Sequence, residues 1–483
     1  MVPINNTLWI EPDAKAAARS NAVRSSYLIA VRLENANWLL INGLTGAIDL
    51  VNDCEYRMLI AGPSTDDSDG LSRALRNRGH ILPPDAECEM ARRLSDRIRS
   101  ESLHGRMHIF LCPTNYCPMG CAYCIQGASP RRSRRSSLSA DMVDAAFRAI
   151  LRLCEEQSRE LGQVLLFGGE PLQQYAFESI LSILLRARQW KIPLFIFTSG
   201  LDLDFFAETL AEYRDVVTRV GVTLDGLAEY HDAKRAMPDA FSRAVRGIER
   251  LAENGVPVLI RSNVGSNGLD QVRQLRSFFE ARGWWANPDF AFELAPLTNH
   301  GCHPGGEQEA PSHFTTARFF YDLLEEDASY RRFRFLGMFS YLAYPAAVLQ
   351  LIQFHPDEFG PHVDVPRIHG CQANMLSTFA FSSDGAIHAC NEQGGSNDTP
   401  AGAFWPELRL DAGRLQAWSE RTIDSIAACR ACAYRFFCGG GCPLTSFRTH
   451  DGDLLHPSCG TIKSDFEQFY QHVAGNILSK WKQ

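Results

Sequence analysis

The alternation of strands and helices between residues 106 and 294 constrains the fold more than any other feature of this sequence. Six apolar runs there have the length and composition of buried strands, with helical patterns between them. The runs are 107–112, 162–167, 193–198, 216–224, 257–263 and 290–294. Repeated strand–helix units predict a parallel sheet and an α/β fold class. Six units predict a partial (β/α)6 TIM-like barrel rather than a complete eight-unit barrel.

One of the helices between these strands has a clear start signal. Ser139 is a suitable N-cap, because its hydroxyl can accept a hydrogen bond from an unpaired N–H of the first turn. Met142, Ala146, Ile150 and Leu153 follow at helical spacing, so they should form one apolar face. We therefore expect a helix after Ser139 that packs against the sheet.

Three further segments surround this barrel, over residues 1–105, 295–370 and 371–483. In the first, two apolar runs between 25 and 52 flank a glycine-containing turn and predict a β-hairpin. Helical stretches follow around 53–61, 70–78 and 85–102, which together suggest a winged-helix-like module. The second is an irregular bridge with one helix at 314–326, and the third is rich in cysteine and ends in a helix at about 463–481.

Composition excludes several classes of protein. The 483-residue chain has a net charge of −8, which argues against a bulk nucleic-acid binder. No apolar run approaches the ~18–20 residues of a membrane span. The first residues lack the basic and apolar regions of a signal peptide. We therefore expect a soluble, cytoplasmic protein that uses neither nucleic acid nor membrane as a partner.

The cysteines indicate metal binding. There are 15, an odd number in a large chain with no sign of secretion, which argues against a disulfide framework. Three lie at 117–124 and seven between 371 and 459, and clustered cytosolic cysteines are typical of metal ligands. The five outside these groups are expected to be ordinary thiols: Cys54, Cys88, Cys112, Cys154 and Cys302.

The first group follows the first strand with the spacing Cys117-x3-Cys121-x2-Cys124. Three thiolates can hold three irons of a cubane iron–sulfur cluster and leave the fourth iron open to a ligand. A structural zinc site usually has four ligands, and no fourth cysteine or histidine is adjacent. Tyr123 lies between the last two cysteines, where an aromatic ring can shield a cluster and contact an adenine.

A second element, Gly168-Gly169-Glu170, follows the second strand. Two glycines let the backbone approach a ligand closely, and the carboxylate of Glu170 suits an α-amino group. By itself this run is also typical of a simple turn at a strand end. One strand–helix unit after the cysteine motif, it indicates a ligand site.

Together these motifs resemble the radical S-adenosylmethionine (radical SAM) enzymes. The resemblance implies that Cys117, Cys121 and Cys124 hold a [4Fe-4S] cluster whose fourth iron is chelated by S-adenosylmethionine. Reductive cleavage of that cofactor would give a 5′-deoxyadenosyl radical that abstracts hydrogen from a substrate carbon. Gly168, Gly169 and Glu170 would bind the methionine amino group.

Further strand ends fit the same family. Thr198 lies in Thr-Ser-Gly, a departure from the family's usual Thr-Asn-Gly, and Thr223 in Thr-Leu-Asp-Gly could keep a hydroxyl contact to the cofactor. Asp225, in that second motif, is a candidate base, although a glutamate is as suitable. His231, Asp232 and Arg235 follow a family pattern, but local loop structure explains them equally well. Arg261 could meet the cofactor carboxylate or be a buried structural arginine.

The cysteine-rich tail resembles the SPASM domain, which carries two auxiliary [4Fe-4S] clusters and would bring the total to three. The family pattern assigns four cysteines to one cluster and three to the other. These are Cys429, Cys432, Cys438 and Cys459 for the first, and Cys371, Cys390 and Cys442 for the second. The second cluster would need a fourth ligand, for which Cys302 is the nearest spare cysteine, or keep an open iron. Without the resemblance, paired zinc sites are the alternative.

The N-terminal hairpin and helices look like the precursor-recognition modules of peptide-maturing members, which pair a leader peptide with a sheet edge. The combined resemblance implies a radical SAM oxidoreductase that modifies a precursor peptide or protein by a C–C or C–S (thioether) cross-link or by oxidation. It also implies an external electron donor of the flavodoxin or ferredoxin type. The alternatives are a sulfatase-type formylglycine maturase, a small-molecule radical SAM dehydrogenase and a non-catalytic zinc-binding adaptor.

Overall fold

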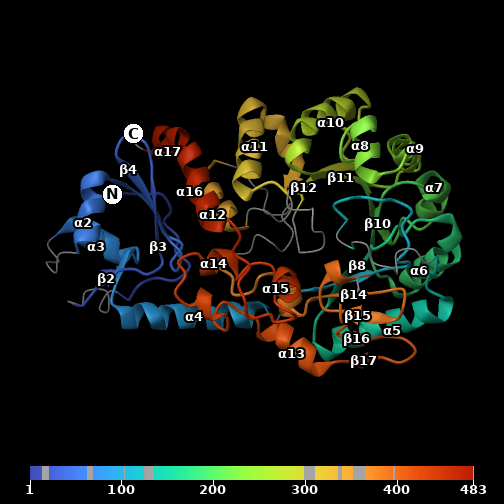
Figure 1. The fold of residues 1–483 in the computed structure, drawn as a ribbon, viewed down its shortest axis with the longest axis horizontal. Coiled ribbons are helices and arrows are strands. Elements are labelled where there is room, and N and C mark those ends of the chain that lie inside the picture. Colours follow the sequence, from blue (N-terminus) through green and yellow to red (C-terminus); the bar gives the residue numbers. More distant parts are fainter. Residues whose placement is uncertain are drawn as a thin grey trace.

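The computed structural model describes residues 1–13, 21–62, 69–102, 104–124, 126, 135–297, 310–335, 340–351, 365–394 and 398–481. The α/β barrel lies at one end of the molecule and a small antiparallel sheet at the other, with the C-terminal segment between them (Figure 1). No helix within these ranges combines the length and apolar character needed to cross a bilayer.

The six predicted strands of the barrel are all present. They are β7 (Met107–Leu111), β8 (Leu161–Leu166), β9 (Leu194–Thr198), β10 (Val217–Thr223), β11 (Val258–Val264) and β12 (Phe290–Pro296). Each is parallel to its neighbours, in the order of the sequence. Their alternate side chains Val164, Ile196, Val220 and Ile260 are buried in one continuous core. The partial barrel predicted from the sequence is therefore confirmed.

Two more parallel strands extend this row beyond the six predicted. β13 (Phe333–Phe335) pairs with β12, and β14 (Thr378–Phe381) pairs with β7. β14 continues through the antiparallel strands β15 (Ala386–His388), β16 (Gly402–Ala403) and β17 (Arg409–Leu410). Residues 295–370 are thus not only an irregular bridge, because part of that segment belongs to the barrel sheet. Strands of three or four residues carry too little periodicity to be recognised in a sequence.

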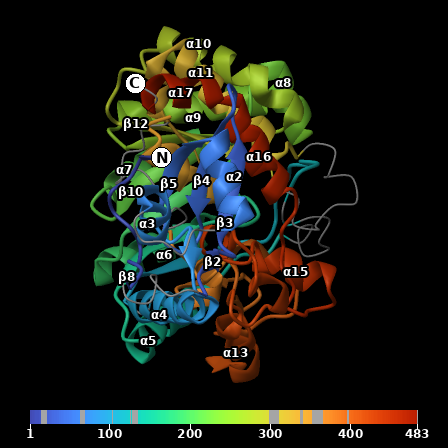
Figure 2. The same ribbon diagram turned by 90° about the vertical axis from the view of Figure 1, so that its left-hand side faces the viewer.

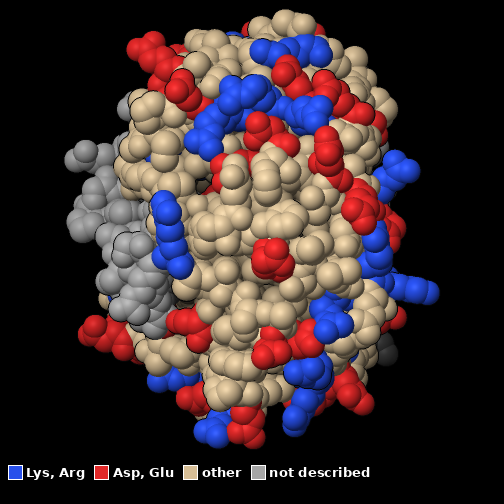
Figure 3. All heavy atoms as spheres, turned by 90° about the vertical axis from the view of Figure 1, so that its right-hand side faces the viewer, with Lys and Arg blue, Asp and Glu red and all other residues tan. Residues whose placement is uncertain are grey.

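Helices cover the outer face of the barrel. They are α5 (Ala140–Glu156), α6 (Phe177–Trp190), α7 (Leu203–Glu212), α8 (Ala228–Arg235), α9 (Ala240–Glu253) and α10 (Leu269–Ala281). The Ser139 side chain accepts a hydrogen bond from the N–H of Met142, as the capping pattern predicts. Basic and acidic side chains are interspersed on the barrel end of the molecule (Figure 3), where Arg250 of α9 pairs with Glu208 of α7 at 3.0 Å.

The N-terminal module is a four-stranded antiparallel sheet in the order β1-β5-β4-β3. Its strands are β1 (Val2–Pro3), β3 (Leu28–Arg32), β4 (Asn37–Asn42) and β5 (Ile48–Asn52). The helices α2 (Asp53–Ala61), α3 (Gly70–Asn77) and α4 (Pro84–Ser102) follow, with β2 (Val23–Arg24) and β6 (Ile81–Leu82) paired beside them. The predicted hairpin is β4–β5, and the β3 edge has no strand partner among the described residues.

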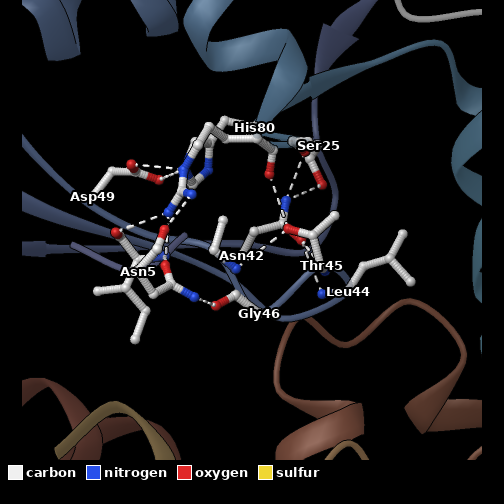
Figure 4. Close-up of polar contacts among 12 residues, drawn as sticks. Asn5, Ser25, Asn42, Leu44, Thr45, Gly46, Asp49 and His80 are labelled. Atoms are coloured by element: carbon white, nitrogen blue, oxygen red, sulfur yellow. Dashed lines mark hydrogen bonds and ion pairs between the residues drawn. The ribbon is translucent and has the colours of Figure 1, made fainter. Parts of the chain in front are cut away.

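A buried polar cluster fixes the turn of this hairpin (Figure 4). The Asn42 side chain accepts hydrogen bonds from the N–H groups of Leu44 and Thr45, both at 2.9 Å. Beside it, the buried carboxylate of Asp49 accepts from Arg78 Nε at 2.9 Å and lies 2.6 Å from Nε2 of His80. These contacts join β4, β5 and the end of α3 into one unit.

The turn of the hairpin also contacts the C-terminal segment. A Cβ at Gly43 would lie 1.9 Å from the carbonyl oxygen of Ala433, so only glycine permits this backbone approach. Around it, Tyr27 and Leu44 share an apolar cluster with Phe436 and Cys429 of the tail. The module is therefore packed onto the cysteine-rich segment through a common core.

The remaining helices join the two ends of the molecule. They are α11 (His313–Glu326), α12 (Ser340–Val348), α13 (Ala412–Glu420), α14 (Arg435–Cys438), α15 (Pro443–Thr449), α16 (Ile462–His472) and α17 (Ala474–Trp481). Phe466, Phe469 and Tyr470 of α16 are buried in the same core as Ile29 and Val31 of β3. Figure 2 shows α16 beside the N-terminal sheet.

We expect Asp49→Ala to destabilise the N-terminal module. The substitution leaves Arg78 and His80 without their buried carboxylate, and breaking a buried charge pair in this way costs about 3–5 kcal/mol. Hydrogen exchange of residues 28–52 measures the local loss of stability. Asp96→Ala, which removes an exposed ion pair with Arg92, is the control. Equal protection of residues 28–52 in the two variants would contradict this account.

Candidate functional site

The three cysteines of the first motif lie on the loop that follows β7, at the carboxyl end of the barrel strands. Cys121 and Met119 are buried against Leu201 and Ala240 of the neighbouring units. The N–H of Gly120 donates to the carbonyl of Arg235 at 3.0 Å, and the N–H of Cys124 donates to that of Cys121 at 3.2 Å. The loop is therefore held against the barrel by backbone hydrogen bonds.

The Gly168–Glu170 turn packs directly against this cysteine loop. Gly169 has a φ of +54°, and a Cβ there would lie 2.5 Å from the carbonyl oxygens of Thr114 and Tyr116. The N–H of Glu170 donates to the Tyr116 carbonyl at 2.8 Å. The two motifs that the sequence places one unit apart are thus adjacent in space.

The side chain of Glu170 is turned into the protein and is 2% exposed. It accepts hydrogen bonds from the N–H of Ser199 at 2.6 Å and from the hydroxyl of Thr198. Burial raises the pKa of Glu170, while its hydrogen bonds to Ser199 and Thr198 act in the opposite direction. These contacts tie the end of β8 to the end of β9. Binding of an amino group by Gly168, Gly169 and Glu170 stays a prediction.

Asp225 is at the centre of a buried polar network behind the cysteine loop. Its carboxylate accepts from the hydroxyl of Tyr123 and from the N–H of Asn263 at 3.0 Å, and it pairs with Arg235 Nε at 2.9 Å. Nη1 of Arg235 lies 3.8 Å from Sγ of Cys121. Burial is the largest effect on the pKa of Asp225 and raises it, but Arg235, His231 and the hydrogen bonds from Tyr123 and Asn263 together outweigh burial, so the pKa is lowered overall. An ionised, paired carboxylate is a poor base, so this geometry favours a structural role for Asp225.

The other residues of this pattern also have local roles. His231 Nδ1 accepts from the N–H of Asp225 at 3.1 Å, and burial lowers the pKa of His231 to about 4. The Asp232 carboxylate accepts from the N–H groups of Asp239 and Phe241 at the start of α9. These contacts agree with the local-structure interpretation of His231 and Asp232.

Arg261, in the middle of β11, lies beside Thr223, the last residue of β10. Arg261 pairs with Glu293 on β12 and stacks over Phe197 at 4.1 Å. Its charge is therefore already balanced within the protein. Contacts of Arg261 and Thr223 with a cofactor stay predictions.

Sequence reasoning missed Gln126, which joins three segments. Its Oε1 accepts from the N–H of Gly169 at 2.8 Å, and its Nε2 donates to the carbonyl of Gly394 at 2.7 Å. Gly394 lies four residues after Cys390, so Gln126 connects the first cysteine loop to the tail. A single glutamine carries no recognisable spacing, which explains why only the structure finds it.

The cysteines of the tail fall into two groups. Cys371, Cys390 and Cys442 pack in one apolar cluster. Burial raises the pKa of Cys390, and the next largest contribution comes from the Cys371 thiol. At Cys371, whose pKa is raised to about 11, burial again comes first and the Cys442 thiol second. Cys302 lies outside the described residues.

The second group contains Cys429, Cys432, Cys438 and Cys459. Burial raises the pKa of Cys429 to about 11, and the thiols of Cys459 and Cys432 add to this rise. Burial raises the pKa of Cys438 to about 12, with Cys459 second. The assignment of these cysteines to two clusters stays a prediction. Within the described ranges, no three His, Cys, Asp or Glu side chains are arranged to hold a single metal ion.

Comparison with known proteins identifies the central domain. Residues 111–275 match the family model described as the Radical SAM superfamily, so the chain contains a radical SAM domain. It is 23% identical over 292 residues to Fe-coproporphyrin III synthase of Methanosarcina barkeri, covering 57% of this chain and 70% of that protein. The matches to further curated relatives, AdoMet-dependent heme synthases, span little more than half of their length.

Solved structures share the wider fold. SuiB of Streptococcus suis, bound to its precursor peptide SuiA, has a TM-score of 0.53 at 18% identity, covering 90% of this chain and 99% of that one. The anSMEcpe structure with bound AdoMet has a TM-score of 0.54 at 16% identity, covering 78% and 99%. This chain therefore shares its overall fold with SuiB and anSMEcpe.

We expect Gly169→Ala to displace the cysteine loop, because its Cβ would overlap two backbone carbonyls that cannot move independently. Iron content after anaerobic reconstitution should fall, by about a third for the three clusters that the sequence resemblance implies. Gly255→Ala is a matched control, since Gly255 also has a positive φ of +67° but open space around it. Equal iron content in the two variants would show that this contact does not position the loop.

Proposed function

We propose that this chain is a radical SAM enzyme that modifies a peptide or protein after translation. The observation that carries the proposal is the extent of the likeness to SuiB, whose structure holds a precursor peptide. That likeness spans 90% of this chain, so it includes more than the radical SAM domain. The match to Fe-coproporphyrin III synthase spans only 57%.

Cys117, Cys121 and Cys124 would hold a [4Fe-4S] cluster beside bound S-adenosylmethionine. When bound, this pair supplies a carbon-centred radical that removes hydrogen from the substrate, a chemistry that belongs to the cofactor. The protein itself positions the cysteine loop. The Gly169 turn packs against its backbone, and Arg235 contacts it through its carbonyl, which accepts from Gly120, and through its guanidinium, which lies beside Cys121. Cys121 is buried, whereas Cys117 and Cys124 are partly exposed.

The seven tail cysteines would hold two auxiliary [4Fe-4S] clusters, one bound by Cys429, Cys432, Cys438 and Cys459 and the other by Cys371, Cys390 and Cys442. An electron donor of the flavodoxin or ferredoxin type would reduce the enzyme. The product would be a C–C or thioether cross-link, or an oxidised residue. Oxidation of a residue, as in a sulfatase-type formylglycine maturase, is the alternative outcome within this proposal.

The N-terminal module would bind the substrate through the β3 edge. The N–H of Leu33 donates to the carbonyl of Asn37 in β4. In an antiparallel pair only every second residue directs its N–H toward the partner strand, so Ala30 and Arg32 direct theirs away from β4. Such outward groups can pair with an added peptide strand. Because α4 and the Gly43 turn pack on the tail, removing the whole module would expose a shared core, and a point substitution is the better test.

Replacing Cys117, Cys121 and Cys124 together with alanine should abolish production of 5′-deoxyadenosine. The measurement is chromatography of the products after incubation with S-adenosylmethionine and dithionite without air. A double Cys54→Ala, Cys88→Ala variant is the control, because both thiols are exposed and lie outside the groups. Production in the triple variant at the level of the control would refute the assigned site.

Ala30→Pro should weaken binding of the substrate peptide at least tenfold while sparing cleavage of S-adenosylmethionine without substrate. Proline removes one outward N–H of β3 without removing a hydrogen bond to β4. Fluorescence anisotropy with labelled peptides encoded beside the gene measures the affinity. Ala30→Val keeps the N–H and should bind the peptide with wild-type affinity. Equal peptide affinities of the Ala30→Pro and Ala30→Val variants would exclude pairing at this edge.

A small-molecule substrate is the second candidate, favoured by the likeness to Fe-coproporphyrin III synthase. Titration with iron coproporphyrin III, followed by its absorption spectrum, tests this directly. Saturable binding of the tetrapyrrole with release of 5′-deoxyadenosine would favour this candidate over a peptide. No change in the spectrum would leave the peptide proposal in place.

A further inference from the structure

Arg421 occupies an unusual position between the two groups of tail cysteines. Its side chain is 0% exposed and is among the largest fully buried side chains in the described structure. Its guanidinium donates to the carbonyls of Gly440 at 2.8 Å and Gly441 at 3.3 Å, within the loop that runs from Cys438 to Cys442. Cys438 belongs to one group and Cys442 to the other.

Further contacts extend from Arg421 to the other cysteine-bearing segments. Nε donates to the carbonyl of Leu454 at 2.8 Å and Nη2 to that of His456 at 3.0 Å, on the segment that leads to Cys459. A Cβ at Gly370, next to Cys371, would lie 3.3 Å from Nη1 of Arg421. One side chain therefore contacts the backbone around both groups.

Every strong hydrogen bond of Arg421 is to a neutral carbonyl, and no described carboxylate forms an ion pair with it. Two other buried arginines differ: Arg235 pairs with Asp225 and Arg435 with Asp424. Burying a cation without a counter-charge carries a large desolvation penalty, which destabilises the folded protein. Burial lowers the pKa of Arg421, and the groups that oppose this effect are the thiols of Cys371, Cys442, Cys429 and Cys438.

We propose that Arg421 is the shared counter-charge of the two auxiliary iron–sulfur sites, a positioning residue that stabilises both thiolate-ligated clusters and raises their reduction potentials together. The inference rests on the auxiliary clusters proposed above. Clusters held by thiolates carry negative charge, and net charge and hydrogen bonding near a cluster set its potential. A cation placed between two such sites favours the more negative, reduced state of each.

The test compares Arg421→Lys with Arg421→Gln in the full-length protein, reconstituted without air. Lysine keeps the charge but loses most of the hydrogen bonds, whereas glutamine keeps hydrogen bonding but loses the charge. Iron and sulfide content and redox titration followed by electron paramagnetic resonance are the readouts. Arg332→Gln is the control, because Arg332 also donates to two backbone carbonyls but lies in the barrel.

We expect Arg421→Lys to load fully with potentials near those of the wild type. Arg421→Gln should shift both auxiliary potentials to more negative values, or lose both auxiliary clusters, about eight of twelve irons. Equal impairment of the two variants, or an unchanged pair of potentials in Arg421→Gln, would overturn the role of Arg421. A wild-type protein with only about four irons would instead overturn the auxiliary clusters themselves.

Discussion

The close packing of the Gly169 turn on the cysteine loop is the contact on which the site depends. Two loops from successive strand–helix units meet here backbone to backbone. Glu170 then joins the second unit to the third, and Asp225 joins the fourth to the cysteine loop and to β11. The carboxyl end of the barrel is therefore a set of loops held by two buried carboxylates.

This arrangement changes how the polar residues near the cysteines are interpreted. Burial disfavours a charged carboxylate, and each carboxylate here is stabilised by hydrogen bonds or by an arginine. Carboxylates whose oxygens already accept hydrogen bonds or pair with an arginine hold the neighbouring loops in place and have little capacity for proton transfer. We therefore expect the substrate to contact residues on the more exposed loops of the barrel, and not Glu170 or Asp225.

Much of the fold could be predicted from the sequence because the barrel strands are long, apolar and regularly spaced. The same reasoning missed β13 and β14, which are too short to show a period and derive their stability from neighbours distant in sequence. The cysteines were readily found, since ligand spacing is a local property. Gln126 and Arg421 were not, because their roles depend on segments that only folding brings together.

The contact between Gly43 and Ala433 has a consequence for the history of such chains. Ala433 follows Cys432 directly, so the hairpin turn touches a segment that also carries proposed cluster ligands. A domain joined only by a flexible tether can be exchanged freely between proteins. Here the two ends of the chain share a core, so a change in one surface requires a complementary change in the other. The N-terminal module and the cysteine-rich tail should therefore be inherited as a pair.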